Sequence, residues 1–288
     1  MECENWQQQI IQHVILKENE DNWELKEKSL LKLNSLITTQ LPSTQLIGLF
    51  KNFHFIEGYA KMINSLRTQL AVSACQTLVT IVQHARTDFE PFGEYFMNVL
   101  IKACGQTKKI VANSAAQTVK ALIFDVPSVK YLQLFNNILS DKNPVLRAKG
   151  AEFFRDLVPK VNFRALSKGP AIELFEDCLR KTLGDGNAIV RTIGYEVLDM
   201  YQLIWPDRTI SFIDSLDYLT RKQLMKRDEK SANSPRKPHG GGKNTLLQEE
   251  PSSIFSPSKL IQSPRKSLYE DFLENENKRT ESRSILEK

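Results

Sequence analysis

The sequence has few residues of the kinds that bind metals. Its 288 residues include four cysteines and four histidines. No two cysteines have C-x-x-C spacing and the histidines are scattered, whereas a zinc site needs clustered ligands. Lone cysteines in apolar helical segments are typical of small core residues in a reducing compartment. We therefore expect no metal and no cofactor. The four cysteines are Cys3, Cys75, Cys104 and Cys178, and the four histidines are His13, His54, His84 and His239.

Long apolar runs and enzyme motifs are also missing. No segment approaches the ~20 apolar residues of a membrane span, and the polar, acidic start MECENWQQQ does not resemble a signal peptide. The sequence has no G-x-G-x-x-G, Walker, G-x-S-x-G or H-E-x-x-H motif. HGGGK (239–243) resembles an oxyanion motif, but no strand precedes it and we interpret it as a linker. We expect a soluble, intracellular protein without enzymatic activity.

Positive charge is in mild excess. The net charge is +5 at pH 7, with 41% apolar and 25% charged residues, which is an ordinary globular composition. The length suits one large domain, or one domain and a tail. The basic excess favours an acidic partner without requiring one.

Residues 5–228 have a helical pattern throughout. Apolar residues recur at i, i+3, i+4 and i+7, as in SACQTLVTIVQHA and NSAAQTVKALIF. The breaks are short and carry glycine, proline, asparagine, aspartate or clustered charge, which are turn and cap signals. The pattern predicts an all-α fold of many short helices.

An internal repeat indicates how these helices are arranged. SDKNPVLRAKGAEFF (140–154) and GDGNAIVRTIGYEVL (184–198) share the pattern D-x-N-x-[VI]-[LV]-R-x-x-G. Weaker copies lie at 64–78 and 105–119, where Cys75 and Ala115 take the place of the glycine. A period of about 35–45 residues with one helix pair per unit predicts an α-solenoid of HEAT-like repeats. We expect about six units, at 3–38, 44–85, 89–125, 128–160, 164–202 and, as one capping helix, 206–228.

The composition changes after residue 228. We expect a repeat domain at 1–228 and a disordered tail at 229–288, because the tail is rich in serine, proline, glycine and charge. Ser267 and Glu270 have capping-box spacing, so 267–279 is either a short helix that forms on a recruiting protein or a frayed tail.

The turns inside the helix pairs of a solenoid share one edge, because each repeat presents the same corner. In this chain those turns carry one tryptophan and a series of cations. Such a narrow positive strip suits an acidic protein surface or a phosphate backbone. The candidate residues are Trp23, Lys26, Arg67, Lys108, Lys109, Lys142, Arg147 and Arg191.

Several of these cations have a second interpretation. Asp141–Arg147 and Asp185–Arg191 share one spacing, so both arginines are candidates for a structural ladder of internal ion pairs, in which the Asp and Arg can pair along the stack. Lys108 and Lys109 open a helix, where the helix dipole disfavours cations. Binding and simple solvation both remain open for these lysines, and equally for Arg67.

Trp23 also allows two interpretations. Asp21 and Glu24 have capping-box spacing around the start of its helix. Trp23 lies seven residues before Leu30, on the extension of the buried stripe, and Lys26 interrupts that stripe. The ring is therefore either a staple that closes the helix end or an exposed contact.

Four blocks together resemble the TOG domain of CLASP-type proteins. These are DNWELKEKSLLKLNSLI, SLRTQLAVSACQTLVTI, DFEPFGEYFMNVLIKACGQTKKIVANSAAQTVKALI and NPVLRAKGAEFF, which are similar to the first four CLASP repeats in order and spacing. The resemblance covers roughly residues 3–220. It implies a TOG array that binds tubulin and microtubules, regulates their dynamics non-enzymatically, and is located in the cytoplasm on the microtubule cytoskeleton and spindle.

The resemblance also implies site residues. In the family, the tryptophan and the basic loop residues face tubulin. Arg usually stands where this chain has Lys26, and the fifth loop here offers little charge apart from Arg191. The matches are Trp23 and Lys26 in the first loop, Arg67 in the second, Lys108 and Lys109 in the third, and Lys142 in the fourth.

Other partners remain open. The main alternative is a HEAT scaffold that binds a different protein without tubulin contact. Nucleic acid fits less well, because aromatic residues are not interleaved with the cations. In the tail, Ser234, Ser256 and Ser263 each begin an S-P-x-K sequence, which predicts phosphorylation by a cyclin-dependent kinase.

Overall fold

The computed structural model describes residues 3–39, 41–167 and 169–232. The predicted tail features, including the helix at 267–279 and the three S-P-x-K serines, lie outside this part of the chain. The described residues form α-helices and one short 3-10 helix, with no strand among them. None of the helices in these ranges is both long enough and apolar enough to cross a membrane. The fold is all-α, as the sequence predicts.

The chain divides into two compact units, residues 1–201 and 202–288. The first unit contains eleven α-helices, η1 and most of α12 among its described residues. In chain order they are α1 (Cys3–Ile15), α2 (Trp23–Thr38), α3 (Ser43–Phe50), α4 (Phe53–Ile63), α5 (Thr68–Ala85), η1 (Arg86–Phe89), α6 (Glu90–Cys104), α7 (Lys109–Asp125), α8 (Tyr131–Ile138), α9 (Pro144–Leu157), α10 (Phe163–Leu166), α11 (Pro170–Leu183) and α12 (Ala188–Ile204).

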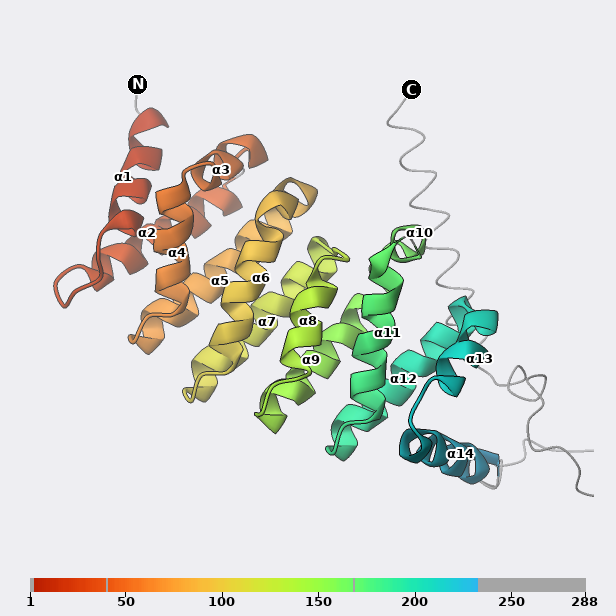
Figure 1. Ribbon diagram of the computed structural model, residues 1–288. Helices are drawn as coiled ribbons and strands as arrows, with labels where there is room; N and C mark the ends of the chain where they lie inside the picture. The colour runs from red at the N-terminus through yellow and green to blue at the C-terminus, as the bar shows by residue number, and fades with distance from the viewer. Residues whose placement is uncertain (1–2, 40, 168, 233–288) are drawn as a thin grey trace, which may run out of the picture. The chain divides into compact units, whose positions relative to one another are not determined.

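The first unit is a stack of antiparallel helix pairs (Figure 1). Within the pairs, α1 packs on α2, α4 on α5, α6 on α7 and α8 on α9. Between the pairs, α2, α5, α7 and α9 form one layer in chain order, while α1, α4, α6, α8 and α11 form the other. The stack is a HEAT-like solenoid.

Small residues let the paired helices approach closely. In α2, α5, α7, α9 and α12, which each form the second helix of a pair, a small residue lies six residues after the first residue of the helix: Ser29, Ala74, Ala115, Gly150 and Gly194. The sequence repeat placed Cys75 at this position, and the helix boundaries correct that to Ala74. A Cβ at Gly150 would lie 2.5 Å from Cγ2 of Ile138, and one at Gly194 would lie 3.0 Å from the carbonyl carbon of Thr182. Larger side chains there would push the helices apart.

An aromatic cluster fills the core between the second and third pairs. Phe50, at the end of α3, lies against Phe55, Phe89 and Phe96, with ring centroids 5.2–5.8 Å apart. All four rings are fully buried. Their edge-to-face contacts add to the hydrophobic stabilisation of these repeats.

The second unit includes α13 (Pro206–Asp214) and α14 (Tyr218–Ala232). The sequence predicts a single capping helix over 206–228, and the structure has two helices there instead. The break has a local cause, because the carboxylate of Asp217 accepts hydrogen bonds from the backbone N–H groups of Leu219 and Thr220. Asp217 therefore starts a new helix, as an N-cap residue does.

Candidate functional site

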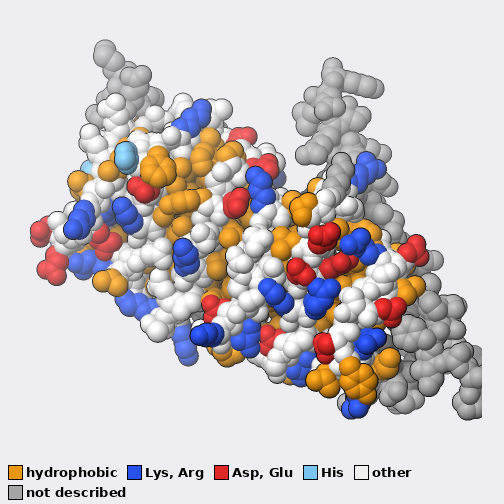
Figure 2. Space-filling model, in the orientation of Figure 1, with side chains coloured by type: hydrophobic (Ala, Val, Ile, Leu, Met, Phe, Trp, Pro, Cys, Tyr) orange, Lys and Arg blue, Asp and Glu red, His pale blue; other side chains and the backbone are white. Residues whose placement is uncertain are grey.

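The turns inside the helix pairs lie along one edge of the first unit (Figure 1). We call this surface the loop edge and define it by residues 16–22, 64–67, 105–108, 139–143 and 184–187, together with the first turn of the helix that follows each. Figure 2 shows Lys and Arg side chains recurring along this edge, with acidic side chains gathered at its first loop.

Two asparagines shape the first loop. The side-chain oxygen of Asn19 accepts hydrogen bonds from the N–H groups of Asp21 and Asn22, and that of Asn22 accepts one from the N–H of Asn19. The helix begins at Trp23 with Asn22 as its N-cap residue. The predicted capping box of Asp21 and Glu24 was therefore wrong, because the reciprocal asparagine bonds set the helix start one residue later.

Trp23 lies beneath a cation of the next repeat. The guanidinium carbon of Arg67 is 5.2 Å from the centre of the indole ring, which is half-buried. The Arg67 Nε is also 3.9 Å from the carboxylate of Glu18. Ser65 fixes this arrangement, because its hydroxyl donates to Glu18 and accepts from the backbone N–H of Arg67. Trp23 thus joins the first repeat to the second and still presents part of its ring.

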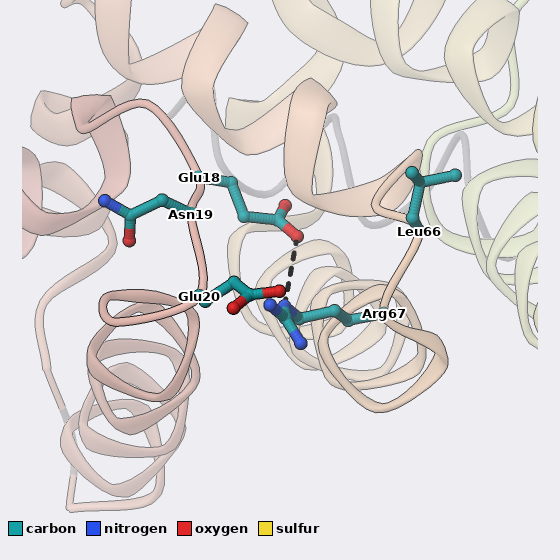
Figure 3. Close-up of a pocket in the computed structure, with 5 residues that line it drawn as sticks. All are labelled: Glu18, Asn19, Glu20, Leu66 and Arg67. Atoms are coloured by element: carbon teal, nitrogen blue, oxygen red, sulfur yellow. Dashed lines mark ion pairs between the residues drawn. The ribbon is translucent and has the colours of Figure 1, made fainter.

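Figure 3 shows the hollow beside this pair. It has a volume of about 340 Å³ and is lined by Glu18, Asn19, Glu20, Leu66 and Arg67. The side chain of Arg67 extends toward the carboxylates of the two glutamates, while Leu66 points away from them (Figure 3). Sequence reasoning missed Glu18 and Ser65, because one acid in an acidic loop and one serine in a turn carry no pattern of their own.

Lys26 is buried, although the sequence placed it among the contact residues. Only 2% of it is exposed, and its Nζ donates to the backbone carbonyl of Val14 at 2.8 Å. Burial lowers the pKa of Lys26, an effect that Glu18 opposes and Lys61 reinforces. Lys26 faces α1 because it lies almost one turn into its helix. The structure therefore gives Lys26 a role in positioning the first loop.

Arg147 and Arg191 occupy the same position in their helices as Lys26, three residues after the first. Each donates to carbonyl groups of the turn that precedes its own helix. Arg147 reaches the carbonyl of Asp141 at 2.9 Å, and Arg191 reaches that of Asp185 at 2.8 Å. Arg147 and Arg191 thus hold the turns before their helices, whereas Lys26 bonds to the last turn of α1. Arg191 therefore faces its own loop.

The structural ladder runs between repeats. The sequence paired Asp141 with Arg147 and Asp185 with Arg191, but the Arg147 Nε lies 2.6 Å from the carboxylate of Asp185 in the next repeat. The Asp141 carboxylate instead accepts from the N–H of Asn143. Burial by itself would raise the pKa of Asp185, but the hydrogen bond from Arg147 and further donors outweigh it and lower that pKa. The ladder thus contains an Asp–Arg pair along the stack, and the assignment of each arginine to the aspartate of its own repeat is corrected.

Arg67 and Lys108 occupy helix N-cap positions, which is unfavourable for the helices that they open. Arg67 precedes α5 and Lys108 precedes α7. Neither side chain has an acceptor for the free N–H groups of the first turn, and the helix dipole repels cations there. In the fourth and fifth repeats, by contrast, Asn143 and Asn187 accept from N–H groups of the first turn.

The other basic residues of the loop edge are open to a partner. Lys108, Lys109 and Lys142 are all exposed. The Lys108 ammonium also donates to the backbone carbonyl of Leu66, so it bridges the second and third loops. The structure brings these lysines, Arg67 and Trp23 to one edge. The side chains of Lys26 and Arg191 are instead hydrogen-bonded to backbone carbonyl groups.

A comparison with known families shows where this chain belongs. The family model described as CLASP N terminal matches residues 6–225. The chain belongs to the CLASP N-terminal family. Protein stu1 of Aspergillus fumigatus is 30% identical over 224 residues, which is 75% of this chain and 16% of that protein. This CLASP N-terminal chain thus corresponds to about one sixth of the length of that relative.

Solved structures have the same fold at low identity. A chain from "Structural Basis of Microtubule Plus End Tracking by XMAP215, CLIP-170 and EB1" aligns with a TM-score of 0.57 at 20% identity, covering 74% of this chain and 87% of that one. A chain from "Structural Basis of Tubulin Recruitment and Assembly by Microtubule Polymerases with Tumor Overexpressed Gene (TOG) Domain Arrays" aligns with a TM-score of 0.52 at 14% identity, covering 74% and 45%. This CLASP N-terminal chain therefore has a TOG-like fold.

Proposed function

We propose that this chain binds tubulin through the loop edge and regulates microtubule dynamics without catalysing a reaction. One observation carries the proposal: Arg67 and Lys108 occupy N-cap positions in place of the capping residues that helices favour. Arg67 lies beside Trp23, and Lys108 lies along the same edge. Cations in positions that oppose local stability are readily explained by a partner of opposite charge. Membership of the CLASP N-terminal family and likeness to a structure described by tubulin recruitment support this partner.

In this proposal the residues have two roles. Trp23, Arg67, Lys108, Lys109 and Lys142 contact the acidic surface of tubulin, on the free dimer or in the microtubule lattice. The others hold the turns that present them, namely Lys26 and Arg191 in their own repeats and the Arg147–Asp185 pair between repeats. The chain is then located on the microtubule cytoskeleton, including the spindle.

The first prediction concerns Trp23 and the third-loop lysines. We expect Trp23→Ala, and separately Lys108→Ala with Lys109→Ala, to lower the fraction of the chain that co-sediments with microtubules. A partly exposed aromatic anchor and desolvated cations typically contribute 1 kcal/mol or more each to an interface, so a loss of about tenfold in affinity is expected for each variant. Circular dichroism melting separates lost contact from lost folding.

The outcome for Trp23→Ala separates the two interpretations of its ring. Either way the Arg67 stacking contact disappears with the ring, which costs about 0.5–1 kcal/mol of stability. A contact predicts lost binding by a variant that is otherwise folded, whereas a staple alone predicts the lower melting temperature with binding retained by the folded variant. If both variants co-sediment like the wild type, the chain does not use this edge for tubulin, and a HEAT scaffold for another protein becomes the better hypothesis.

We also propose that phosphorylation of the tail weakens microtubule binding. Each phosphate at Ser234, Ser256 and Ser263 would add roughly −1.5 to −2 charge beside lysines and arginines of the S-P-x-K sequences. We expect a triple Ser→Glu variant to co-sediment less than the wild type at low salt, and to differ less as salt screens the charges. A triple Ser→Ala variant is the matched control. Equal binding by the Glu and Ala variants contradicts this role of the tail.

A further inference from the structure

Among the exposed apolar side chains of the loop edge, three occupy the same position in their helices. Ile110, Val145 and Ile189 are 67%, 64% and 61% exposed. Each is the second residue of its helix, in α7, α9 and α12. We call these three residues the apolar row. The same helix position in α2 and α5 carries Glu24 and Gln69, so the row is confined to the third, fourth and fifth repeats.

The stability of the fold does not explain why these exposed positions carry apolar side chains. Exposed single apolar residues are common on proteins, but here the same choice recurs at one position in three consecutive repeats. β-branched residues are weaker helix formers than the straight-chain polar residues that suit an exposed first turn. The backbone does not need them either, since the N–H groups of Val145 and Ile189 bond to the side chains of Asn143 and Asn187.

The apolar row lies among the basic residues. Lys108 and Lys109 directly precede Ile110 in the chain, and Lys142 lies in the loop just before Val145. Packed helices are about 8–10 Å apart, so successive members of the row are close enough to meet one partner surface. Protein interfaces commonly have an apolar centre with a charged rim, in which the centre supplies affinity and the rim steers association.

We propose that Ile110, Val145 and Ile189 are apolar anchors of the tubulin contact, seated on the same acidic surface that Lys108, Lys109 and Lys142 face. The proposal rests on the proposed function and deepens it, because it assigns the affinity of the third to fifth repeats to apolar burial. It also gives the fifth repeat a part in binding, although its one loop arginine, Arg191, faces its own turn.

Salt dependence distinguishes the two kinds of contact. Screening weakens the attraction of exposed charges as ionic strength rises, whereas apolar burial is not weakened in this way. The test is microtubule co-sedimentation of the full chain over a series of salt concentrations. The test variant carries Ile110→Thr, Val145→Thr and Ile189→Thr, which keep a β-branched side chain and so disturb the helices little. A second variant carries Lys109→Gln and Lys142→Gln.

We expect the threonine variant to bind roughly tenfold more weakly at every salt concentration, with an unchanged salt slope. The glutamine variant is expected to lose binding mainly at low salt and to have a flatter slope. Leu31→Gln is the matched control, since Leu31 is a comparably exposed apolar residue of α2 that lies about two turns from the start of that helix and outside the loop edge. It should bind like the wild type.

Three other results would overturn the inference. If the threonine variant binds like the wild type while the glutamine variant does not, the row is not a contact and the proposed function stands. If neither variant differs from a wild type that binds, the loop edge is not the tubulin site, and both proposals fail. If size-exclusion chromatography shows a dimeric wild type and a monomeric threonine variant, the row joins two copies of this chain.

Discussion

Lys108→Asn is expected to make the chain more stable and a weaker binder of microtubules. Asparagine is among the best N-cap residues, and a good cap in place of a poor one typically adds about 1 kcal/mol to the free energy of unfolding. Lys108 occupies the N-cap position of α7 with an extended backbone. The next repeat already has an asparagine, Asn143, at the corresponding N-cap position of α9. For a domain of this size the gain corresponds to roughly 2–4 °C in melting temperature.

The cost of removing the lysine is small for the fold and large for the proposed contact. The ammonium of Lys108 donates to the carbonyl of Leu66, but the residue is exposed, and hydrogen bonds of exposed groups contribute little net stability. Against an acidic partner the lost cation weakens association, most strongly at low salt. The substitution therefore moves stability and binding in opposite directions, which a purely structural residue would not do.

Lys108→Ala is the matched control, because it removes the same charge without supplying a capping oxygen. We expect the alanine variant to bind as weakly as the asparagine variant and to lack its gain in stability. Arg67→Asn should gain less than Lys108→Asn, since it also loses the stacking on Trp23, a contact worth about 0.5–1 kcal/mol at exposed sites. Unchanged microtubule binding by Lys108→Asn, with the fold intact, contradicts the functional interpretation of the cap positions.

Features that depend on local pattern were predictable from the sequence. The helical period, the repeat with its small residue and the turn cations are all properties of short segments, and the structure has the predicted all-α HEAT-like array. The one-residue error at Cys75 arose because that copy of the repeat has adjacent small residues, Ala74 and Cys75. The sequence alone does not say which of them faces the neighbouring helix.

Features that depend on packing between distant segments were not predictable in this way. Lys26 looked like a surface cation, and only the position of α1 shows that its ammonium reaches the carbonyl of Val14. The partner of Arg147 is Asp185, 38 residues further along the chain, although an aspartate with the repeated spacing is much nearer in sequence. The spacing was common to both repeats because each arginine holds its own turn, while the ion pair crosses to the next repeat.

Gly58→Ala is expected to destabilise the first repeats, whereas Gly48→Ala is expected to stabilise the chain. A Cβ at Gly58 would lie 2.5 Å from the backbone oxygen of Val14, a distance that real Cβ contacts do not reach. Because backbone cannot swing aside as a side chain can, α1 and α4 must separate, and overpacking of this kind costs about 1–3 kcal/mol. Gly48 is also helical but has nothing within 4 Å of a new Cβ, so alanine there gains roughly 0.5–1 kcal/mol.

Urea unfolding followed by circular dichroism measures both changes, and equal m-values would show that the two variants lose the same structure as the wild type. The Gly58 variant should also bind microtubules more weakly, although it alters no proposed contact residue. Val14, whose oxygen the new methyl group displaces, is the acceptor for Lys26, and Lys26 lies one turn from Trp23. Lost stability in Gly58→Ala with full microtubule binding would show that Trp23 is positioned without the support of α1, and that Lys26 has no part in presenting the first loop.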